Sequence, residues 1–384
     1  MPFNKKALSL HRKLKGKIEI KSKLKLKTMS DLSLAYTPGV GAVCRAIYEK
    51  KNLSWELTNR GNQVAIVCDG TAVLGLGNIG PEAGMPVMEG KSIIFKEFAN
   101  IDAMPLCIDT QDTEEIIKFC KQIAPSFGGI NLEDISAPRC FEILDRLEKE
   151  LDIAVFHDDQ DGTAIVVLAA LLNACRVSKK KIEDLKVVVN GAGAAGIATA
   201  RLLKARGIKN LIVLDSKGII CSSRQDLNKY KKEIALKGDV RGDLAEAMQG
   251  ADVFIGLSKA DLVNIKMVKS MNSEPIIFAM ANPVPEIMPD KAMKAGAVVV
   301  GTGRSDFPNQ INNALVFPGM FLGLLEGWEK KVSLEMKLSA AEAIANSVKK
   351  PHKNKILPKV TDKSVVKLIA KAVMSKQKRR KACC

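Results

Sequence analysis

The sequence of 384 residues is 47% hydrophobic, which excludes wholesale disorder, and it is long enough for two domains of roughly 150–200 residues each. Its formal net charge of +17 comes from the two ends, because residues 1–28 hold ten Lys/Arg and residues 349–384 hold thirteen. Aromatic residues make up only 4%, so few rings are available to stack on bases, and nucleic-acid binding is not expected as the main function. We interpret the basic ends as solvated segments. A nucleic-acid binder that depends on these ends is the alternative.

Cysteine usage and hydropathy indicate the compartment. The nine cysteines include no C-x-x-C spacing and mostly lie in apolar runs, a pattern typical of reduced thiols. The longest apolar stretch, Ala164–Ala174, is much shorter than the roughly 20 residues of a membrane span and predicts a buried helix. The N-terminus lacks the residue order of a secretory signal. We therefore expect a cytoplasmic protein without a membrane partner.

The first half predicts a short strand, a loop and then an α/β unit. Apolar and charged residues alternate from Ile18 to Lys27, which predicts a half-buried strand whose lysines protect an exposed edge. The Pro and Gly of Tyr36-Thr37-Pro38-Gly39 predict a loop. Four continuous apolar runs then predict strands at Val64–Cys68, Met104–Ile108, Gly129–Leu132 and Ile153–Phe156.

A second series of apolar runs begins near Lys186, with helical patterns such as Ala194–Lys204 between them. Its predicted strands are Val187–Val189, Leu211–Leu214, Val253–Leu257, Ile276–Met280 and Val298–Val300. Strand–helix alternation with continuous apolar strands predicts parallel sheets covered on both faces. We expect an α/β protein of two domains: residues 1–158, and residues 159–384 as a Rossmann-type, doubly wound parallel-sheet dinucleotide-binding domain with a C-terminal helical tail.

A dinucleotide motif opens the second domain. A predicted strand runs into Gly191-Ala192-Gly193-Ala194-Ala195-Gly196, a helix follows, and Asp215 ends the next strand. Gly191 permits a tight turn, Gly193 lets the backbone approach a pyrophosphate, and Gly196 allows close helix–strand packing. Asp215 favours NAD through the ribose hydroxyls, whereas Ser216 and Lys217 could hold the 2′-phosphate of NADP, and this choice stays open. The alternative is a glycine-rich turn that binds nothing.

Carboxylates follow two predicted strands of the first domain. Glu133-Asp134 ends one strand and Asp158-Asp159 ends another, with Asp161 close behind. Neighbouring parallel strands would bring these groups together at their carboxyl ends, where ligands bind in open α/β sheets. Crowded carboxylates repel one another unless a cation or proton intervenes, and all-oxygen ligands favour Mg²⁺ or Mn²⁺. The alternative is a set of solvated strand-end acids or helix caps.

Two further residues are candidates for proton transfer. Tyr36 lies in a Pro/Gly loop, and Lys91 follows Glu89-Gly90 at the predicted start of a helix. Taken alone, each has an ordinary alternative role, Tyr36 as a packing residue and Lys91 as a solvated surface charge.

Longer motifs surround these candidates. The chain resembles the malic enzyme family, in its small bacterial-type form, from about residue 10 to 340. The segments that carry the resemblance are, in order, Leu32–Val40, Asp69–Asn78, Met88–Lys91, Gly129–Asp134, His157–Gln160, Ala281–Glu286, Gly303–Asn313 and Phe317–Gly319. Beyond residue 340 we expect little similarity.

The resemblance implies that residues 1–158 form the malic enzyme catalytic domain. It implies oxidative decarboxylation of (S)-malate to pyruvate and CO₂, with NAD or NADP and with Mg²⁺ or Mn²⁺. The implied roles are as follows: Glu133, Asp134 and Asp159 as metal ligands, Lys91 as general base with Asp158 coupled to it, Tyr36 as the acid that protonates the enol, and Lys91, Asn282, Asn312 and Asn313 as substrate ligands. A lysine base needs a lowered pKa, which burial or nearby positive charge could supply.

Two features depart from the family pattern. The family usually has His where this chain has Asp161, and an extra carboxylate there could shift neighbouring pKa values and the pH optimum. The basic tail that ends in Cys383-Cys384 resembles nothing catalytic, and we interpret it as a solvated end rather than a lipidated one.

Other functions are compatible with the same fold. A malolactic-type enzyme would share cofactor, metal and fold but release lactate. A non-catalytic scaffold that binds a dinucleotide is less compatible, because all the implied catalytic residues are present. A homodimer is expected, since most enzymes of this size are symmetric oligomers.

Overall fold

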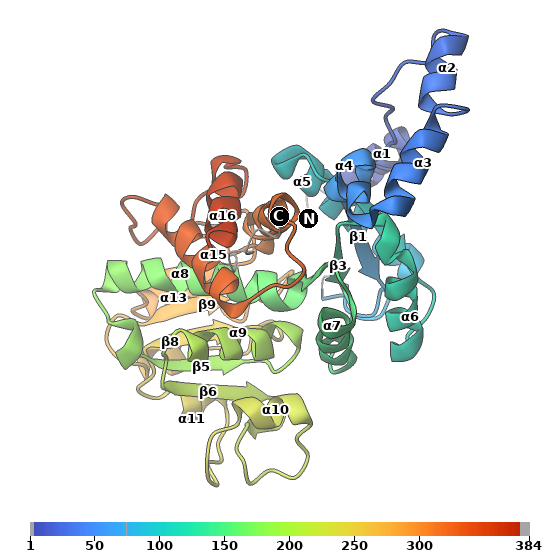
Figure 1. The fold of residues 1–384 in the computed structure, drawn as a ribbon. Helices are drawn as coiled ribbons and strands as arrows, with labels where there is room; N and C mark the ends of the chain where they lie inside the picture. Colours follow the sequence, from blue (N-terminus) through green and yellow to red (C-terminus); the bar gives the residue numbers. More distant parts are fainter. Residues whose placement is uncertain (1–3, 74, 377–384) are drawn as a thin grey trace.

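The computed structural model describes residues 4–73 and 75–376, which fold around two sheets (Figure 1). The N-terminal sheet has four parallel strands in the order β2-β1-β3-β4. Its strands are β1 (Gln63–Cys68), β2 (Asp102–Cys107), β3 (Gly129–Glu133) and β4 (Ala154–His157). The helices of this half are α1 (Asn4–Leu14), α2 (Met29–Ala35), α3 (Val40–Glu49), α4 (Ser54–Leu57), α5 (Pro81–Ala99), α6 (Thr113–Ile123) and α7 (Arg139–Glu150).

The second sheet has six strands in the order β10-β9-β8-β5-β6-β7, all parallel except for the β6–β7 pair. They are β5 (Lys186–Asn190), β6 (Asn210–Asp215), β7 (Gly218–Ile219), β8 (Val253–Gly256), β9 (Ile276–Ala279) and β10 (Val299–Thr302). The helices are α8 (Thr163–Ser178), α9 (Ala194–Ala205), α10 (Lys229–Ile234), α11 (Leu244–Met248), α12 (Ile265–Lys269), α13 (Pro289–Lys294), α14 (Phe317–Glu326), α15 (Leu334–Ser347) and α16 (Ser364–Met374). This arrangement confirms the predicted α/β class.

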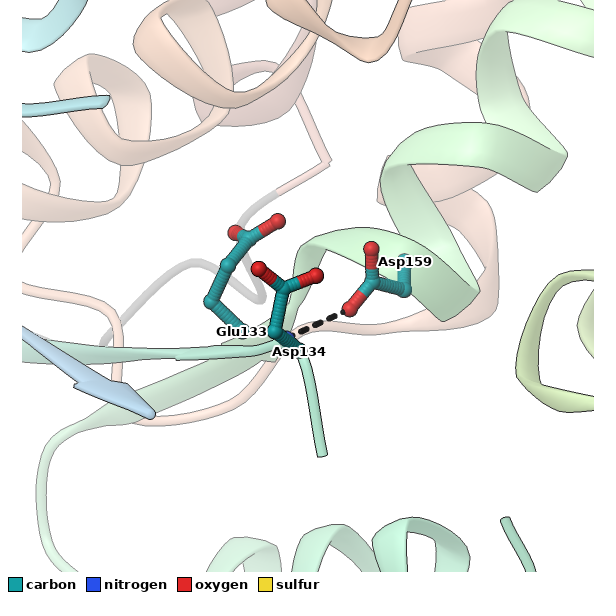
Figure 2. Close-up of side chains that lie close together, drawn as sticks. All are labelled: Glu133, Asp134 and Asp159. Carbon is teal, nitrogen blue, oxygen red and sulfur yellow. Dashed lines mark hydrogen bonds between the residues drawn. The ribbon is translucent and has the colours of Figure 1, made fainter. Parts of the chain in front are cut away.

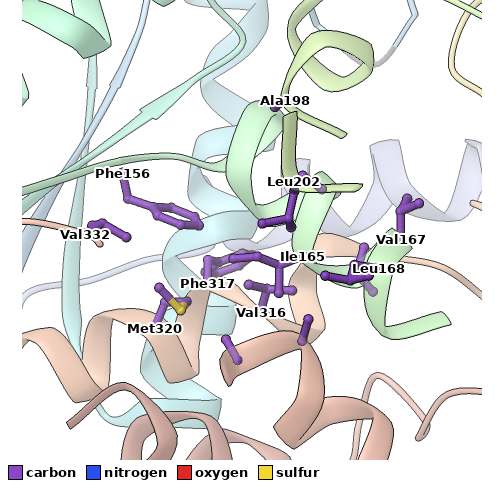
Figure 3. Close-up of a cluster of buried hydrophobic side chains, with 14 of the residues drawn as sticks. Phe156, Ile165, Val167, Leu168, Ala198, Leu202, Val316, Phe317, Met320 and Val332 are labelled. Atoms are coloured by element: carbon purple, nitrogen blue, oxygen red, sulfur yellow. The ribbon is translucent and has the colours of Figure 1, made fainter. Parts of the chain in front are cut away.

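One continuous hydrophobic core connects the two sheets. Its buried residues come from β1, β3 and β4 as well as from β5, α8 and α14. The ring centroids of Phe156 on β4 and Phe321 on α14 lie 5.9 Å apart, and Figure 3 shows Phe156 and Phe317 in the same cluster. The ring centroids of Phe95 on α5 and Phe317 lie 4.7 Å apart. The C-terminal helices therefore pack against the N-terminal half, and both halves hold the region between the sheets in place.

Helix α8 lies at the centre of this core, as the apolar stretch Ala164–Ala174 predicts. Together with the turn before it, Asp158–Ser178, it is long and apolar enough to cross a membrane by length and composition alone. However, 78% of its most apolar window is buried inside the protein, as is typical of a core helix. The same segment begins with Asp158 and Asp159, so it also carries candidate site residues.

Two local predictions in the N-terminal half are wrong. Residues 18–27 form no strand and are exposed, because none of the described strands lies beside them to complete a ladder. Lys91 does not begin a helix but lies well inside α5, which starts at Pro81. The turn at Tyr36–Gly39 is present, and it joins α2 to α3, two helices without any buried residue. Both helices project away from the two sheets (Figure 1).

Candidate functional site

Sheet register brings the predicted carboxylates together. Glu133 is the last residue of β3, and Asp159 lies in the π-helical turn Asp158–Gly162 that directly follows β4. Strands β3 and β4 are parallel neighbours, with Leu132 paired to His157, so their carboxyl ends meet at one edge. The predicted pairing of these two strand ends is confirmed.

Glu133, Asp134 and Asp159 each offer a carboxylate oxygen, and these oxygens lie within 4.8 Å of one another. Figure 2 shows the three side chains gathered at the end of β3. The backbone N–H of Asp134 donates to Asp159 Oδ2 at 2.8 Å, which fixes the two loops together. Asn131 Nδ2 donates to Glu133 Oε2 at 2.9 Å, whereas Asp134 Oδ2 is buried without a hydrogen-bond partner. An oxygen in this position is available to a cation.

Lys91 reaches the same edge from α5. Its Nζ lies 3.0 Å from Glu133 Oε1, donates to Asp158 Oδ2, and lies 4.6 Å from the centroid of the Phe317 ring. Asp158 is completely buried, and its Oδ1 has no hydrogen-bond partner. The structure therefore places Lys91 and Asp158 in contact, beside the three gathered acids.

Burial dominates the electrostatics of this site. It raises the pKa of Asp134 to about 9, with repulsion from Asp159 and Glu133 adding to the shift. It raises the pKa of Glu133 to about 7, of Asp158 to about 7 and of Asp159 to about 6, although Lys91 opposes each of these shifts. Burial alone would lower the pKa of Lys91, but the charges of Asp158 and Glu133 outweigh it, so the pKa lies above its usual value. Without a bound cation, the ammonium group of Lys91 therefore keeps its proton and cannot accept another.

The predicted substrate asparagines lie in different places. Asn313 opens a 3₁₀ turn (Asn313–Leu315), and its Cβ would lie 3.3 Å from a Cβ added to Gly162, so it adjoins the acidic turn. Asn312 uses its side-chain oxygen to accept from the N–H of Ala314 at 2.8 Å. Asn282 is exposed after β9, next to the cis peptide bond with Pro283. Of the three predicted substrate asparagines, Asn313 is therefore the one that the structure places against the acidic turn.

Tyr36 is not brought to the acid cluster. It forms the C-cap of α2, on the projecting arm that consists of α2 and α3, and it is 65% exposed. The other two tyrosines do not replace it, because Tyr48 lies on the same arm with 88% exposure and Tyr230 is buried against Phe141 of α7. Within the part of the chain that the structure describes, no tyrosine hydroxyl lies beside Lys91.

The glycine motif has the predicted strand–turn–helix geometry. Gly191 follows β5 with φ at 120°, a backbone conformation that favours glycine. Gly193 is the N-cap of α9, so Ala194 and Ala195 form the first turn, where free N–H groups can meet phosphate oxygens. A Cβ at Gly196 would lie 1.8 Å from the carbonyl oxygen of Gly191, so only glycine allows the helix to pack this closely.

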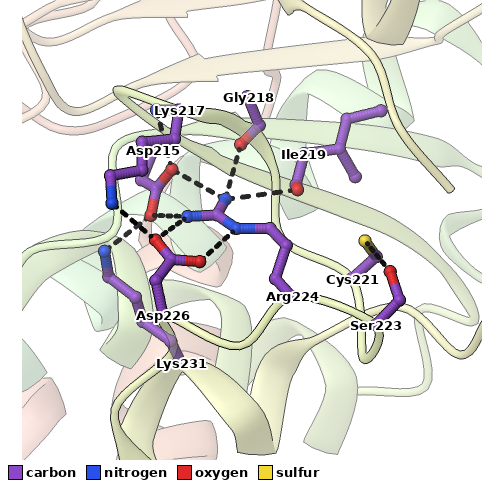
Figure 4. Close-up of polar contacts among 9 residues, drawn as sticks. All are labelled: Asp215, Lys217, Gly218, Ile219, Cys221, Ser223, Arg224, Asp226 and Lys231. Carbon is purple, nitrogen blue, oxygen red and sulfur yellow. Dashed lines mark hydrogen bonds and ion pairs between the residues drawn. The ribbon is translucent and has the colours of Figure 1, made fainter. Parts of the chain in front are cut away.

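Asp215 ends β6, the strand next to the motif, and is surrounded by basic groups (Figure 4). Arg224 Nη1 and Nη2 donate to its two carboxylate oxygens at 2.9 and 3.0 Å, and Lys231 Nζ donates to Oδ2 at 2.6 Å. Lys217 donates its backbone N–H to Asp215, and its Nζ lies 3.0 Å from Asp226. Burial would raise the pKa of Asp215, but hydrogen bonds from Arg224 and Lys231 hold it below its usual value.

Several functional contacts escape sequence reasoning. Arg224 lies nine residues after Asp215, Phe317 lies far along the chain from Lys91, and Lys337 pairs with Asp161 at 2.8 Å. Each contact joins segments that only the tertiary fold brings together. Of these residues, only Phe317 lies in a motif that the sequence analysis identified, Phe317–Gly319. That motif did not indicate a contact with Lys91.

Comparison with known proteins agrees with this geometry. Family models described as "Malic enzyme, N-terminal domain" and "Malic enzyme, NAD binding domain" match residues 15–148 and 160–378. The second match extends past residue 340, so the expectation of little similarity there is wrong. The NAD-dependent malic enzyme of Geobacillus stearothermophilus is 54% identical over 94% of this chain and 76% of that protein.

Two further proteins resemble the chain over nearly their whole lengths. The bifunctional malic/malolactic enzyme of Bacillus subtilis is 51% identical over 97% of this chain and 92% of that protein. The crystal structure of the NAD-dependent malic enzyme of Thermotoga maritima is 49% identical, covers 96% of this chain and 98% of that one, and has a TM-score of 0.93. The chain belongs to the malic enzyme family.

Proposed function

We propose that this chain oxidises (S)-malate with a nicotinamide dinucleotide and releases pyruvate and CO₂, with help from Mg²⁺ or Mn²⁺. The observation that carries the proposal is the contact between Lys91 and two buried acids, Glu133 and Asp158, on the edge where three carboxylates gather. A base, a cluster of hard oxygen ligands and a dinucleotide turn are the parts that this reaction needs.

The acid cluster fits a divalent cation. Glu133, Asp134 and Asp159 offer only oxygen atoms, and Asp134 Oδ2 is buried without a partner. The raised pKa values show that these acids are costly to ionise without a compensating charge. We assign these three residues as the metal ligands. A bound Mg²⁺ or Mn²⁺ supplies Lewis acidity, which stabilises negative charge on a substrate oxygen during decarboxylation.

Lys91 is proposed as the base that takes the proton of the C2 hydroxyl, with Asp158 as the group that shares that proton. Glu133 and Asp158 now raise the pKa of Lys91. When Glu133 is engaged by a cation, its pull on Lys91 weakens and the lysine becomes easier to deprotonate. Asn313 beside the acidic turn is proposed to orient the substrate, with Asn282 and Asn312 as less direct contributors.

Tyr36 is proposed as the acid that protonates C3, supplied by the second subunit of a homodimer. Its own arm has no buried residue in α2 or α3, and the arm projects from the body with exposed apolar side chains. These include Met29, Leu34 and Tyr48, and the segment that precedes α2 exposes Ile20, Leu24 and Leu26 as well. Such a surface suits burial against a second copy of the chain. If so, mixing inactive Tyr36→Phe and Lys91→Met proteins under subunit exchange should restore activity.

The proposed cofactor is NAD, because Asp215 at the end of β6 can accept hydrogen bonds that the adenosine ribose hydroxyls donate. NADP is the second candidate, favoured by the basic groups Lys217, Arg224 and Lys231 around that acid.

Residues 1–158 and 159–384 are proposed as the two domains. We also propose a cytoplasmic location, on the reduced-thiol pattern of the cysteines.

A malolactic activity is the second candidate reaction, because a relative at 51% identity is named as a bifunctional malic/malolactic enzyme. The test follows absorbance of the reduced nicotinamide with malate and Mn²⁺, in parallel with NAD⁺ and NADP⁺ and with a chelator control. A metal-dependent rise with pyruvate is expected. Lactate without net reduced cofactor would favour the malolactic reaction. Folded protein that forms neither product would overturn both.

A further inference from the structure

Two cysteines that the proposed reaction does not use lie side by side at the carboxyl edge of the N-terminal sheet. Cys68 ends β1 and Cys107 ends β2, and they are register partners in the parallel pairing of these strands. Cys68 is also the register partner of Glu133 on β3. Side chains at one register position of a parallel sheet point to the same face. The two thiols and Glu133 therefore form one row across the sheet, on the face that α5 covers.

The two thiols differ in access. Cys68 is fully buried, accepts from the N–H of Gly70 at 3.2 Å, and lies 3.6 Å from a Cβ added to Gly84 of α5. Cys107 is only partly buried, and its Sγ lies 4.0 Å from Met85 Sδ. A small oxidant can therefore react with the thiol of Cys107 first, and the buried thiol of Cys68 then reacts with the oxidised Cys107.

The backbone positions suit a disulfide. Neighbouring strands lie about 4.7–4.9 Å apart, which is within the roughly 4.4–6.8 Å that separate the Cα atoms of bonded cysteines. Interaction with the neighbouring thiol lowers the pKa of Cys107, and Cys107 is also the more accessible of the two. Since a thiolate is the reactive form and the oxidant must reach it, Cys107 is the nucleophile and Cys68 the resolving thiol.

We propose that Cys68 and Cys107 form a reversible disulfide when the protein meets hydrogen peroxide, and that this bond weakens cation binding by the acid cluster. The thiolate of Cys107 attacks one peroxide oxygen, breaking the O–O bond, and gives a sulfenic acid with release of one water after protonation. The thiol of Cys68 then attacks the Cys107 sulfur, forming the S–S bond and releasing a second water. Two thiols lose two electrons in total, and one peroxide becomes two waters.

The backbone connects Cys68 directly to the acid cluster. Residues 69–72 follow Cys68, and the N–H groups of Thr71 and Ala72 donate to the carbonyl oxygen of Asp134 at 3.1 and 2.9 Å. Strand pairing connects Cys68 to Glu133 as well. Movement of Cys68 toward β2 on disulfide formation therefore shifts two of the three acids, Glu133 and Asp134. This effect on metal binding rests on the proposed metal site, whereas formation of the disulfide does not.

The test uses the full chain with Cys44, Cys383 and Cys384 replaced by serine, so that exposed or terminal thiols do not interfere. The protein is treated with hydrogen peroxide, blocked with N-ethylmaleimide and digested with trypsin. Residues 61–91 contain Cys68 alone and residues 97–118 contain Cys107 alone, so their linked mass identifies the bond. We expect this linked peptide, its loss with dithiothreitol, and its absence in Cys107→Ser and Cys107→Ala. Peroxide treatment that leaves no linked peptide would overturn the proposal.

A second measurement follows Mn²⁺ affinity by titration calorimetry before and after oxidation. We expect Kd to rise about tenfold on oxidation, to recover with dithiothreitol, and to stay constant in Cys107→Ser. An oxidised protein that contains the disulfide but binds Mn²⁺ as before would overturn the coupling to the acid cluster. If the reduced protein binds no Mn²⁺ at all, the proposed metal site fails, and the linked peptide still decides whether the disulfide forms.

Discussion

The acid cluster beside Lys91 and the ionic cluster around Asp215 both stand at the carboxyl ends of parallel strands, but their charges are balanced in opposite ways. In the first, Glu133, Asp134, Asp158 and Asp159 share one lysine. Burial raises the pKa of each of these acids, and two of their oxygens are buried without a partner. Negative charge exceeds positive charge there.

Around Asp215 the balance is reversed. Arg224, Lys231 and Lys217 pair with two acids, Asp215 and Asp226, and the pKa of both acids lies below its usual value because these cations donate to them. Every carboxylate oxygen of Asp215 has a donor. The cluster is stable as it stands, and it carries a small excess of positive charge.

The difference shows what each site can accept. A buried cluster with unbalanced negative charge needs a cation or protons from outside, so it suits a metal site. In a balanced cluster each charge already has a partner of opposite sign. A ribose hydroxyl can therefore bind Asp215, or a phosphate Arg224, only by displacing one of these partners. The acid cluster therefore suits the binding of a cation, whereas the cluster around Asp215 suits discrimination between two cofactors.

The largest effect is expected from Lys91→Met, which removes the positive charge from the acid cluster and the proposed base with it. Turnover of malate should fall by about a thousandfold, because general bases contribute rates of this order. The measurement is the steady-state rate with saturating malate and Mn²⁺. Lys96→Met is the matched control, since Lys96 lies on the same helix but pairs with Asp102 at the surface. Equal rates in the two variants would remove Lys91 from the mechanism.

Asp215→Ser should reverse the choice of cofactor. Removal of this carboxylate leaves Arg224 and Lys231 without their main partner, so they can bind a 2′-phosphate instead. We expect NAD binding to weaken and NADP binding to strengthen, each by about 10- to 100-fold, as lost or gained hydrogen bonds to charged groups imply. Calorimetric Kd values measure both. Asp239→Asn is the control, because it lies in the same region and pairs with Arg241. Unchanged preference would place selection outside this cluster.

The strands could be predicted because their apolar runs are continuous. Val64–Cys68 and Val187–Val189 are buried on both faces, and only a sheet covered by helices buries a strand in this way. The alternating segment Ile18–Lys27 failed because alternation describes a surface, and a strand also needs a neighbour with free backbone groups. Hydrophobic pattern predicts an element well where burial is complete and poorly where it is absent.

The site could be predicted in part for a similar reason. Glu133 and Asp159 follow buried parallel strands, so the sheet itself fixes their meeting point. Contacts such as Arg224 with Asp215 depend on how a loop folds back, and no local spacing encodes them. Tyr36 differs from both, because the motif identifies the residue whereas the fold of a single chain leaves it exposed, so its role as the acid stays a prediction. A sequence motif does not tell which copy of a chain supplies a residue.

Proton release on metal binding should distinguish the two clusters at pH 7. Burial and repulsion raise the pKa of Asp134 to about 9, so the metal-free folded protein still holds this proton, and a cation must displace it. Because folded Asp134 binds a proton that the unfolded chain lacks above pH 4, this group's contribution to stability falls as pH rises toward 9. We expect release of about one to two protons per Mn²⁺ in calorimetry with two buffers of different ionisation enthalpy, because Glu133, with a pKa raised to about 7, is also partly protonated.

Cofactor binding is the internal control for that measurement. Asp215 has a lowered pKa and is already ionised, so NAD should displace no proton from it. A binding enthalpy for Mn²⁺ that does not depend on the buffer would mean that the acid cluster is ionised without the metal. The contrast between the two clusters would then be wrong.

The smallest effect is expected from loss of the ion pair between Lys337 and Asp161, which lies next to the acid cluster. Lys337 of α15 pairs with Asp161, two residues after Asp159, and this pair accounts for the carboxylate that departs from the family pattern. Lys337→Met leaves a largely buried carboxylate unpaired, so the free energy of unfolding should fall by about 1 to 3 kcal/mol. Urea denaturation measures it. Lys330→Met, which breaks an exposed pair with Asp152, should cost less than about 1 kcal/mol. Adding Asp161→Asn to Lys337→Met should restore part of the loss, because no uncompensated charge then remains; a double variant as unstable as the single one would show that Lys337 acts by packing and not by charge.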